Sequence, residues 1–494
     1  MNSKFLASLA LFGAFLTIAA AQELPPPAPF EEKSLAYTGG EYENETFRYL
    51  LLKPDAIEEG KQYPLVLFLH GAGERGDDNR IQKAHFPVLF TDEALRKRFP
   101  CFLVAPQCRT DKRWTQTSWE DTSSPSSKGP TTAQMDVAVQ ALLDTLDANP
   151  IDRSRIYLTG LSMGGYGSWD LSVRMPDWFA AVAPICGGGD TDLAHRLVTT
   201  PVWAYHGDAD GAVPVRRSRD MIAAIRQSGG LPRYTEIPGR GHDSWVPAYN
   251  DDHNNLINWM FQQRLPSVDQ RAIAGVEALG SAHSPLEKGE RIVFLGDSLT
   301  AAGVGPDGYI TLLRQELGSR RPDLDIQLIG AGIGGHKVPD IRARLDRDVL
   351  AFGPSVVFIF IGVNDVWHTM MGKGTSEADY ENGLKDVIAR CQKAGAQVVL
   401  ATPPLIGEKH RGQNKFDGKL DDYADISRKV ATRMGVTVCD LRESMTSYLR
   451  IFNTTGAETG ILTTDGVHFT KNGNRFVADH IAQSIYQALS AARR

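Results

Sequence analysis

A chain of 494 residues is too long for a single hydrophobic core, so its length predicts about three domains or two large ones. Its 42% hydrophobic and 23% charged residues are ordinary for a globular protein and exclude a fibrous or disordered chain. The formal net charge of −6 leaves no surplus of lysine and arginine for phosphate contacts, which argues against a nucleic-acid partner.

The first 21 residues have the pattern of a secretory signal peptide. Lys4 precedes an apolar run that begins at Phe5 and ends in Ala19-Ala20-Ala21. A basic head, an apolar stretch and small residues at the exit predict cleavage after Ala21. The run is short for a membrane span, so an uncleaved anchor is the less favoured alternative. We therefore expect a secreted or periplasmic protein without stable membrane association.

The cysteines are few for an exported protein of this size, so disulfides are not expected to form its framework. Cys101 and Cys108 flank one strand end, and the sequence is compatible with a bridge between them or with two free thiols. The five cysteines are Cys101, Cys108, Cys186, Cys391 and Cys439.

Beyond a proline-rich leader at 24–29, strand and helix patterns alternate up to residue 264. Such alternation predicts a mostly parallel sheet covered on both faces, with reactive groups beyond the carboxyl ends of the strands. We expect strands at 47–52, 65–69, 102–105, 156–159, 180–184, 202–205 and 234–237, and helices at about 131–148, 163–175, 215–228 and 252–263.

Residues 265–289 show no sustained apolar period and end in glycine, serine and proline, so we interpret them as an interdomain linker. The alternation then restarts, which predicts a second, smaller α/β domain over 290–494. We expect strands at 292–295, 326–329, 356–361, 398–401 and 436–438, and helices near 308–317, 339–350, 377–394, 417–434 and 471–490.

Gly160-Leu-Ser162-Met-Gly164 lies between a β-branched run and a helical pattern. A serine on a sharp strand-to-helix turn has its hydroxyl pushed clear of the backbone, and flanking glycines let the neighbouring elements pack closely. The pentapeptide therefore predicts a nucleophile elbow with Ser162 as the nucleophile. A serine hydroxyl needs a base to take its proton, and usually an acid to orient that base.

Two later segments resemble the α/β-hydrolase family, in which the acid precedes the histidine. The stretch 206–210 follows one apolar strand and contains Asp208 and Asp210, and His242 follows the next strand. The spacing of Asp210 before Val213-Pro214 is similar to the family's acid loop. The resemblance therefore implies His242 as the base and Asp210 as the acid, with Asp208 as the alternative.

The segment His70-Gly71-Ala72-Gly73 is also similar to this family. The resemblance implies that the backbone N–H groups of Ala72 and Met163 hold the developing oxyanion. Over residues 40–264 these motifs look like those of feruloyl esterases, acetylxylan esterases and polyester depolymerases. Trp114 and Trp119 could line an open cleft or simply pack the domain.

The second domain begins with Gly296-Asp297-Ser298-Leu299 at the end of its first expected strand. Three further blocks follow in order at 330–335, 361–365 and 464–468. Together the four blocks look like the SGNH (GDSL) hydrolase family, which implies a flavodoxin-like, three-layer α/β/α domain over 290–494.

The same resemblance implies the residues of a second site. Ser298 would be the nucleophile, His468 its base and Asp465 the orienting acid. The oxyanion donors would be the backbone N–H groups of Ser298 and Gly335 and the side-chain amide of Asn364.

The second block departs from the family pattern, which often begins with asparagine where position 330 is glycine. Trp367 and His368 follow Asn364, and they either contact substrate or pack the domain.

These features predict a secreted, bifunctional carboxylic-ester hydrolase that removes acetyl or feruloyl esters from plant or algal polysaccharide at two independent sites. A lipase or lysophospholipase activity, a peptidase activity of the first domain, and one domain retained only for binding are the alternatives. We expect no cofactor and no metal, since Asp208, Asp210, Asp251, Asp252 and His253 do not show a recognised ligand spacing.

Overall fold

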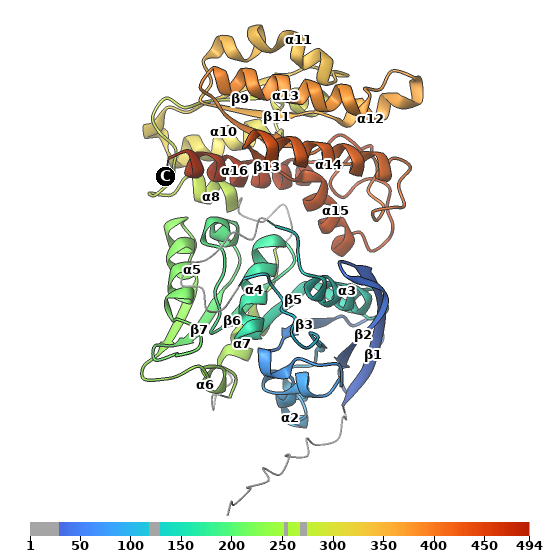
Figure 1. Cartoon of the computed structure of the whole chain (residues 1–494), viewed down its shortest axis with the longest axis vertical. Helices are drawn as coiled ribbons and strands as arrows, with labels where there is room; N and C mark the ends of the chain where they lie inside the picture. The colour runs from blue at the N-terminus through green and yellow to red at the C-terminus, as the bar shows by residue number, and fades with distance from the viewer. Residues whose placement is uncertain (1–28, 118–128, 251–254, 267–273, 494) are drawn as a thin grey trace, which may run out of the picture.

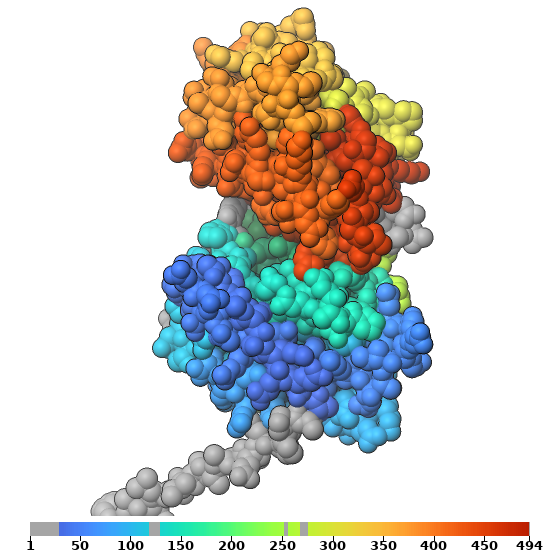
Figure 2. Space-filling model, turned by 90° about the vertical axis from the view of Figure 1, so that its right-hand side faces the viewer, coloured from blue at the N-terminus to red at the C-terminus, as the bar shows by residue number. Residues whose placement is uncertain are grey.

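The computed structural model describes residues 29–117, 129–250, 255–266 and 274–493. The expected signal peptide and Trp119 lie outside these residues. The chain forms two α/β domains stacked end to end, with the second (yellow to red) above the first (blue to green) in Figure 1 and Figure 2. Within the described residues, no helix is long and apolar enough to cross a membrane.

The first domain is built on an eight-stranded sheet with the order β1-β2-β4-β3-β5-β6-β7-β8. The strands from β4 to β8 run parallel, and β1 and β2 form an antiparallel edge. This confirms the expected mostly parallel sheet. The strands are β1 (Phe30–Gly39), β2 (Tyr42–Leu52), β3 (Tyr63–Leu69), β4 (Phe102–Pro106), β5 (Ile151–Leu161), β6 (Ala181–Ile185), β7 (Trp203–Gly207) and β8 (Arg233–Ile237).

Alternating side chains along these strands pack into two separate cores, as the period of two in a strand requires. Leu65 and Leu67 face one core, and Val66 and Phe68 face the other. The first core is covered by α3 (Ala133–Ala148), α4 (Met163–Arg174), η3 (Thr191–Leu197) and α5 (Arg216–Gln227). The second is covered by α1 (Phe86–Leu89), α2 (Glu93–Arg98), α6 (Trp245–Tyr249) and α7 (Asn255–Gln262). The short 3₁₀ helices η1 (Ala72–Glu74) and η2 (Ile81–Lys83) follow β3.

The second domain has a five-stranded, all-parallel sheet with the order β10-β9-β11-β12-β13. This 2-1-3-4-5 order is that of flavodoxin-like sheets and confirms the expected three-layer fold. The strands are β9 (Arg291–Gly296), β10 (Gln327–Gly332), β11 (Val356–Phe360), β12 (Gln397–Ala401) and β13 (Thr437–Cys439).

Helices cover both faces of this sheet. One face packs on α8 (Ala274–Leu279), α10 (Tyr309–Arg320), α15 (Leu441–Phe452) and α16 (Lys471–Ala492). The other packs on α11 (Val338–Asp348), α13 (Glu377–Lys393) and α14 (Asp417–Met434). The remaining elements are α9 (Ser298–Gly303), α12 (Val363–Trp367), η5 (Pro322–Leu324), η6 (Leu350–Phe352) and η7 (His368–Met371).

One expectation needs correction, and one open alternative is decided. The segment interpreted as a linker contains α8, whose Val276 and Leu279 are buried against α16, so this part of it belongs to the second core. Its apolar run was too short to show a helical period. Cys101 and Cys108 are both buried free thiols, so they do not form a bridge.

The domains meet at the edge of the first sheet where the parallel strands begin. Asp147 at the end of α3 forms an ion pair with Arg450 at the end of α15 (2.5 Å). Arg153, near the start of β5, donates to the carbonyl of Ile451 (2.5 Å). His195 stacks on Tyr486 of α16, with ring centroids 5.0 Å apart. The second domain therefore covers the edge opposite to the carboxyl ends of β3, β5, β6 and β7.

Candidate active sites

Ser162 lies on the turn between β5 and α4, with φ 54° and ψ −117°. L-residues rarely adopt this backbone conformation, and it persists only where the surrounding structure imposes it. The glycines at the turn impose it: a Cβ on Gly164 would lie 1.8 Å from the carbonyl oxygen of Leu69, and one on Gly160 would lie 2.4 Å from that of Gly164. The start of α4 is thereby held against the end of β3, as the elbow predicted.

The expected base and acid lie beside Ser162. The Ser162 hydroxyl is 2.8 Å from Nε2 of His242, and Nδ1 of His242 donates to Oδ2 of Asp210 at 2.7 Å. The other carboxylate oxygen of Asp210 accepts the backbone N–H groups of Ala212 and Val213, both at 2.9 Å. This arrangement fixes the imidazole with Nδ1 protonated and Nε2 free to take the serine proton.

Burial alone would raise the pKa of Asp210, whose side chain has no exposed surface. Hydrogen bonds with His206 and His242 and with the backbone of Val213 instead hold that pKa well below its ordinary value. His206, for which the sequence predicted no role, is itself buried with Nε2 3.2 Å from Oδ2 of Asp210. Asp208 does not contact His242; it accepts the backbone N–H of Gly239 at 2.6 Å.

Ala72 and Met163 each start a helix beside Ser162, at η1 and α4. Backbone N–H groups at the start of a helix have no partner within it, so both are available as donors. The buried His70 supports this loop: Nδ1 donates to the carbonyl of Gly71 (2.6 Å), and Nε2 accepts the N–H of Cys108 (2.9 Å). Burial lowers the pKa of His70 to about 4, so its imidazole is neutral and structural.

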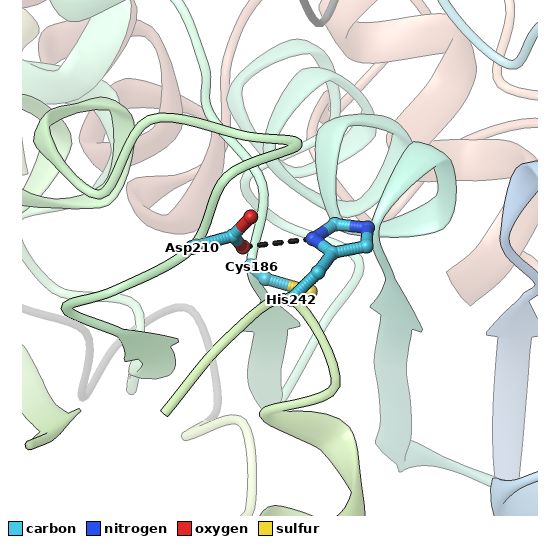
Figure 3. Close-up of side chains that lie close together, drawn as sticks. All are labelled: Cys186, Asp210 and His242. Carbon is cyan, nitrogen blue, oxygen red and sulfur yellow. Dashed lines mark hydrogen bonds and ion pairs between the residues drawn. The ribbon is translucent and has the colours of Figure 1, made fainter. Parts of the chain in front are cut away.

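Cys186, Asp210 and His242 place three potential metal-binding atoms within 4.8 Å of one another (Figure 3). The dashed line in Figure 3 marks the hydrogen bond that already engages His242 with Asp210. Burial raises the pKa of the Cys186 thiol to about 12, so it stays protonated, and a protonated thiol is a poor ligand. This donor set therefore fits an acid–base pair with an inert thiol behind it better than a metal centre.

Trp114 packs the domain and does not line a cleft. Its side chain is buried, and its indole N–H donates to the carbonyl of His70 at 3.0 Å.

The second site has the same relay in a different fold. Ser298 is the first residue of α9, directly after β9, and its hydroxyl is 3.0 Å from Nε2 of His468. Nδ1 of His468 donates to Oδ2 of Asp465 at 2.7 Å. Oδ1 of Asp465 accepts the backbone N–H groups of Val467 (2.9 Å) and His468 (2.8 Å), so one turn carries both base and acid.

The expected oxyanion donors of this site come from the start of α9 (Ser298), the loop after β10 (Gly335) and α12 (Asn364). Gly335 has φ +76° and would meet nothing within 4 Å if a Cβ were added, so the backbone conformation requires glycine there, and packing does not. The amide nitrogen of Asn364 donates to the carbonyl of His336 at 3.1 Å, which places Asn364 beside the Gly335 loop. At position 330, a Cβ would lie 2.4 Å from Cγ1 of the exposed Val304, so a larger residue there would require the Val304 side chain to move.

Trp367 packs partly against the second core, and His368 opens η7 half-buried.

Glu408 anchors the loop that carries Asp465 and His468, and sequence reasoning missed it. Its side chain is buried and accepts the backbone N–H groups of Ile461 (2.8 Å) and Leu462 (2.7 Å) as well as the N–H and hydroxyl of Thr463. Four donors on one buried carboxylate fix the loop just before the acid. A lone glutamate in a loop gave no sequence signal for this role.

Two further carboxyls are buried beside Ser298. Burial and the charge of Asp365 raise the pKa of Asp297 to about 7, and burial raises that of Asp365 to about 6. Each has one oxygen without a hydrogen-bond partner, although Asp297 accepts the N–H of Leu299 (2.9 Å) and Asp365 accepts that of Val338 (3.1 Å).

Comparison with protein families matches each half of the chain. Residues 42–219 match the family described as "Putative esterase", and residues 294–476 match the GDSL-like lipase/acylhydrolase family.

Among individual proteins, the chain is 28% identical over 178 residues to an acetylxylan esterase of Geobacillus stearothermophilus, covering 33% of this chain and 80% of that protein. It is 26% identical over 189 residues to a protein of Aspergillus terreus named "Probable feruloyl esterase C", covering 37% of this chain and 62% of that protein. The chain is also similar to the crystal structure of an acetyl xylan esterase, with 43% sequence identity and a TM-score of 0.38. The match covers 39% of this chain and 97% of that one.

Proposed function

We propose that this chain, a serine carboxylic-ester hydrolase that joins an esterase-family domain to a GDSL-like lipase/acylhydrolase domain, removes acetyl or feruloyl esters from plant or algal polysaccharide. Each domain would act through its own site, on the exported protein. One observation carries the proposal: Ser162–His242–Asp210 and Ser298–His468–Asp465 are two complete hydrogen-bonded relays in one chain. The similarity to acetylxylan and feruloyl esterases supports the choice of substrate.

The same sequence of steps applies at both sites. As the serine oxygen bonds to the ester carbonyl carbon, its proton moves to Nε2 of the histidine, and the carbonyl oxygen becomes an oxyanion. Backbone N–H groups hold the oxyanion at both sites, together with the side-chain amide of Asn364 at the second. The bond to the sugar oxygen then breaks, and the histidine returns the proton to the departing hydroxyl. Water, deprotonated by the same histidine, hydrolyses the acyl-serine and releases the acid.

The roles of the individual residues can be tested by removing each nucleophile alone. Ser162→Ala, Ser298→Ala and the double variant are compared for acetate release from acetylated xylan and ferulate release from a feruloylated oligosaccharide. We expect each single variant to lose part of the activity and the double variant to lose it all, whereas the exposed Ser319→Ala keeps it. Single variants that both retain every activity of the parent would reject the two-site proposal.

A specific feature of the second site favours a different ester there. Four exposed apolar side chains lie within a few residues after Ser298, Gly332 or Asn364 in the sequence. They are Val304 (46% exposed), Ile333 (39%), Met370 (55%) and Met371 (60%). We propose that these side chains contact the acyl group, since an apolar lining favours a long acyl chain. A lipase-type activity of the second domain is therefore the second candidate, tested on Ser162→Ala with p-nitrophenyl esters of increasing chain length. A maximum at long chains would support it, and a maximum at acetate would reject it.

Export is proposed from the N-terminal sequence. Sequencing the N-terminus of the protein recovered from outside the cytoplasm should give Gln22 as the first residue, and Met1 would reject cleavage.

A further inference from the structure

His85 has a backbone conformation close to that of the proposed nucleophile. Its φ of 67° and ψ of −100° compare with 54° and −117° at Ser162. Such a conformation is unfavourable for a residue with a Cβ, so it persists only where neighbouring contacts impose it. The next residue, Phe86, is completely buried against Phe68 and Tyr249, so the sharp bend sends Phe86 into the core and leaves His85 outside it.

The His85 ring contacts the loop of the expected oxyanion donor. Nε2 of His85 donates to Oε1 of Glu74 at 3.3 Å. The other carboxylate oxygen of Glu74 would lie 3.0 Å from a Cβ on Gly71, the residue before Ala72. Burial alone would raise the pKa of Glu74, but the hydrogen bond from His85 and the backbone of Gly71 contribute to lowering it. A charged carboxylate is therefore held between His85 and this loop.

His85 is also linked to the proposed base, through the ring of Trp245. Its ring lies 5.3 Å from that of Trp245, and the Trp245 ring lies edge-on to His242 at 5.3 Å and 89°. Glu74, His85 and Trp245, which we call the clasp, thus join the loop after β3 to the loop after β8. Between these strands the sheet places β5, β6 and β7, so no strand pairing sets the distance between the two loops.

We propose that His85 is a positioning residue of the first site: through Glu74 it holds the oxyanion loop, and through Trp245 it holds the His242 ring toward Ser162. The inference rests on the proposed function of that site. His85 does not contact Ser162, His242 or Asp210 itself. A purely local role as a helix cap does not account for it, because its side chain makes no capping hydrogen bond to α1.

The test uses the full-length chain with Ser298→Ala, so that only Ser162 reacts with a fluorophosphonate probe. The rate of Ser162 labelling reports the base and the oxyanion donors without requiring the natural ester. We compare the parent with His85→Gly, His85→Gln, Glu74→Gln and, as a control, the exposed neighbour Val246→Ala. The thermal midpoint of unfolding is measured for each.

We expect His85→Gly to keep or raise the thermal midpoint, since glycine adopts this φ freely, while labelling slows about tenfold, because small misplacements of reacting groups are costly. His85→Gln retains an amide that can reach Glu74 and should recover part of the rate. Glu74→Gln should slow labelling to a similar extent, and Val246→Ala should not change it.

If Ser162 of the parent is labelled and His85→Gly or Glu74→Gln is labelled at the same rate as the parent, this inference alone is overturned. A folded parent whose Ser162 does not label at all overturns the proposed function together with the inference. If His85→Gly unfolds at a lower temperature, Glu74→Gln decides the question.

Discussion

The orienting carboxylates of the two sites differ in exposure, and Asp210 has a further partner in His206. The difference in exposure predicts unequal effects of the same substitution. Asp210 and Asp465 each accept two backbone N–H groups on Oδ1 and the histidine Nδ1–H on Oδ2. Replacing either with asparagine leaves the amide oxygen on the backbone donors and turns the amide nitrogen toward the imidazole. The loss of the acceptor for Nδ1–H is therefore common to both variants.

The loss of charge is not common to both. The Asp210 side chain has no exposed surface, whereas that of Asp465 is 52% exposed. A carboxylate near 4 Å from the imidazolium stabilises it by about 4 kcal/mol at an effective dielectric constant of about 20, and by about 1 kcal/mol in water. The difference of about 3 kcal/mol corresponds to about a hundredfold in rate. Asp210→Asn should thus reduce kcat/KM about a hundredfold more than Asp465→Asn does.

The assay isolates each site by removing the other nucleophile. Asp210→Asn is measured in Ser298→Ala and Asp465→Asn in Ser162→Ala, each against its own parent, with p-nitrophenyl acetate at a pH where both parents are active. Thermal midpoints of all four proteins serve as the folding control. Equal losses in folded variants, or a larger loss at Asp465, would refute the reasoning from burial.

Three further substitutions test the frame around the sites. Gly164→Ala should destabilise the first domain by at least about 3 kcal/mol, since its Cβ would lie 1.8 Å from the Leu69 carbonyl oxygen. Gly73→Ala, whose Cβ would meet nothing within 4 Å, is the control. Equal unfolding midpoints of the two variants would contradict the packing argument. Glu408→Gln places an amide donor against backbone N–H donors, which should lower the free energy of unfolding by about 1–3 kcal/mol and slow hydrolysis only at the second site. A loss of activity shared by the first site would show a global effect. Because the folded state raises the pKa of Asp297 from 3.8 to about 7, it holds a proton that the unfolded chain loses, so stability falls as pH rises from about 4 to 7. Asp297→Asn should weaken that fall in urea titrations, and an unchanged pH profile would count against the shift.

The sequence predicted the elements that carry strong periodic signals, and physical reasons explain those it missed. The parallel strands are almost completely buried, so they appear as short apolar runs. The edge strand β1 mostly alternates exposed and half-buried residues in a charged segment and gave no such run. The short helix α8 lies within 265–289, and its apolar face becomes meaningful only against α16, which is nearly two hundred residues later.

For the sites, sequence order was sufficient to name the residues that the structure brings together. Ser162, Asp210 and His242 are far apart in sequence, but each follows the end of a parallel strand, so the fold places them at one edge. Their supports could not be predicted this way. Glu408 acts through buried contacts with residues more than fifty positions away, and His206 reaches Asp210, four residues later, only through the fold of the loop after β7. The bend at His85 is set by the packing of Phe86. Such roles depend on tertiary packing that no local pattern encodes.

The domain interface bears on why two such sites share a chain. Asp147, Arg153 and His195 contact the second domain on the side of the first sheet away from the ends of β5 and β7, where Ser162 and Asp210 lie. Ile451 of α15, in the second domain, is buried in the hydrophobic core of the first domain. These contacts lie away from the end of the sheet that carries Ser162, and they hold the second domain against the first. Under the proposed function, a polymer engaged by one domain would meet the other domain at a raised local concentration.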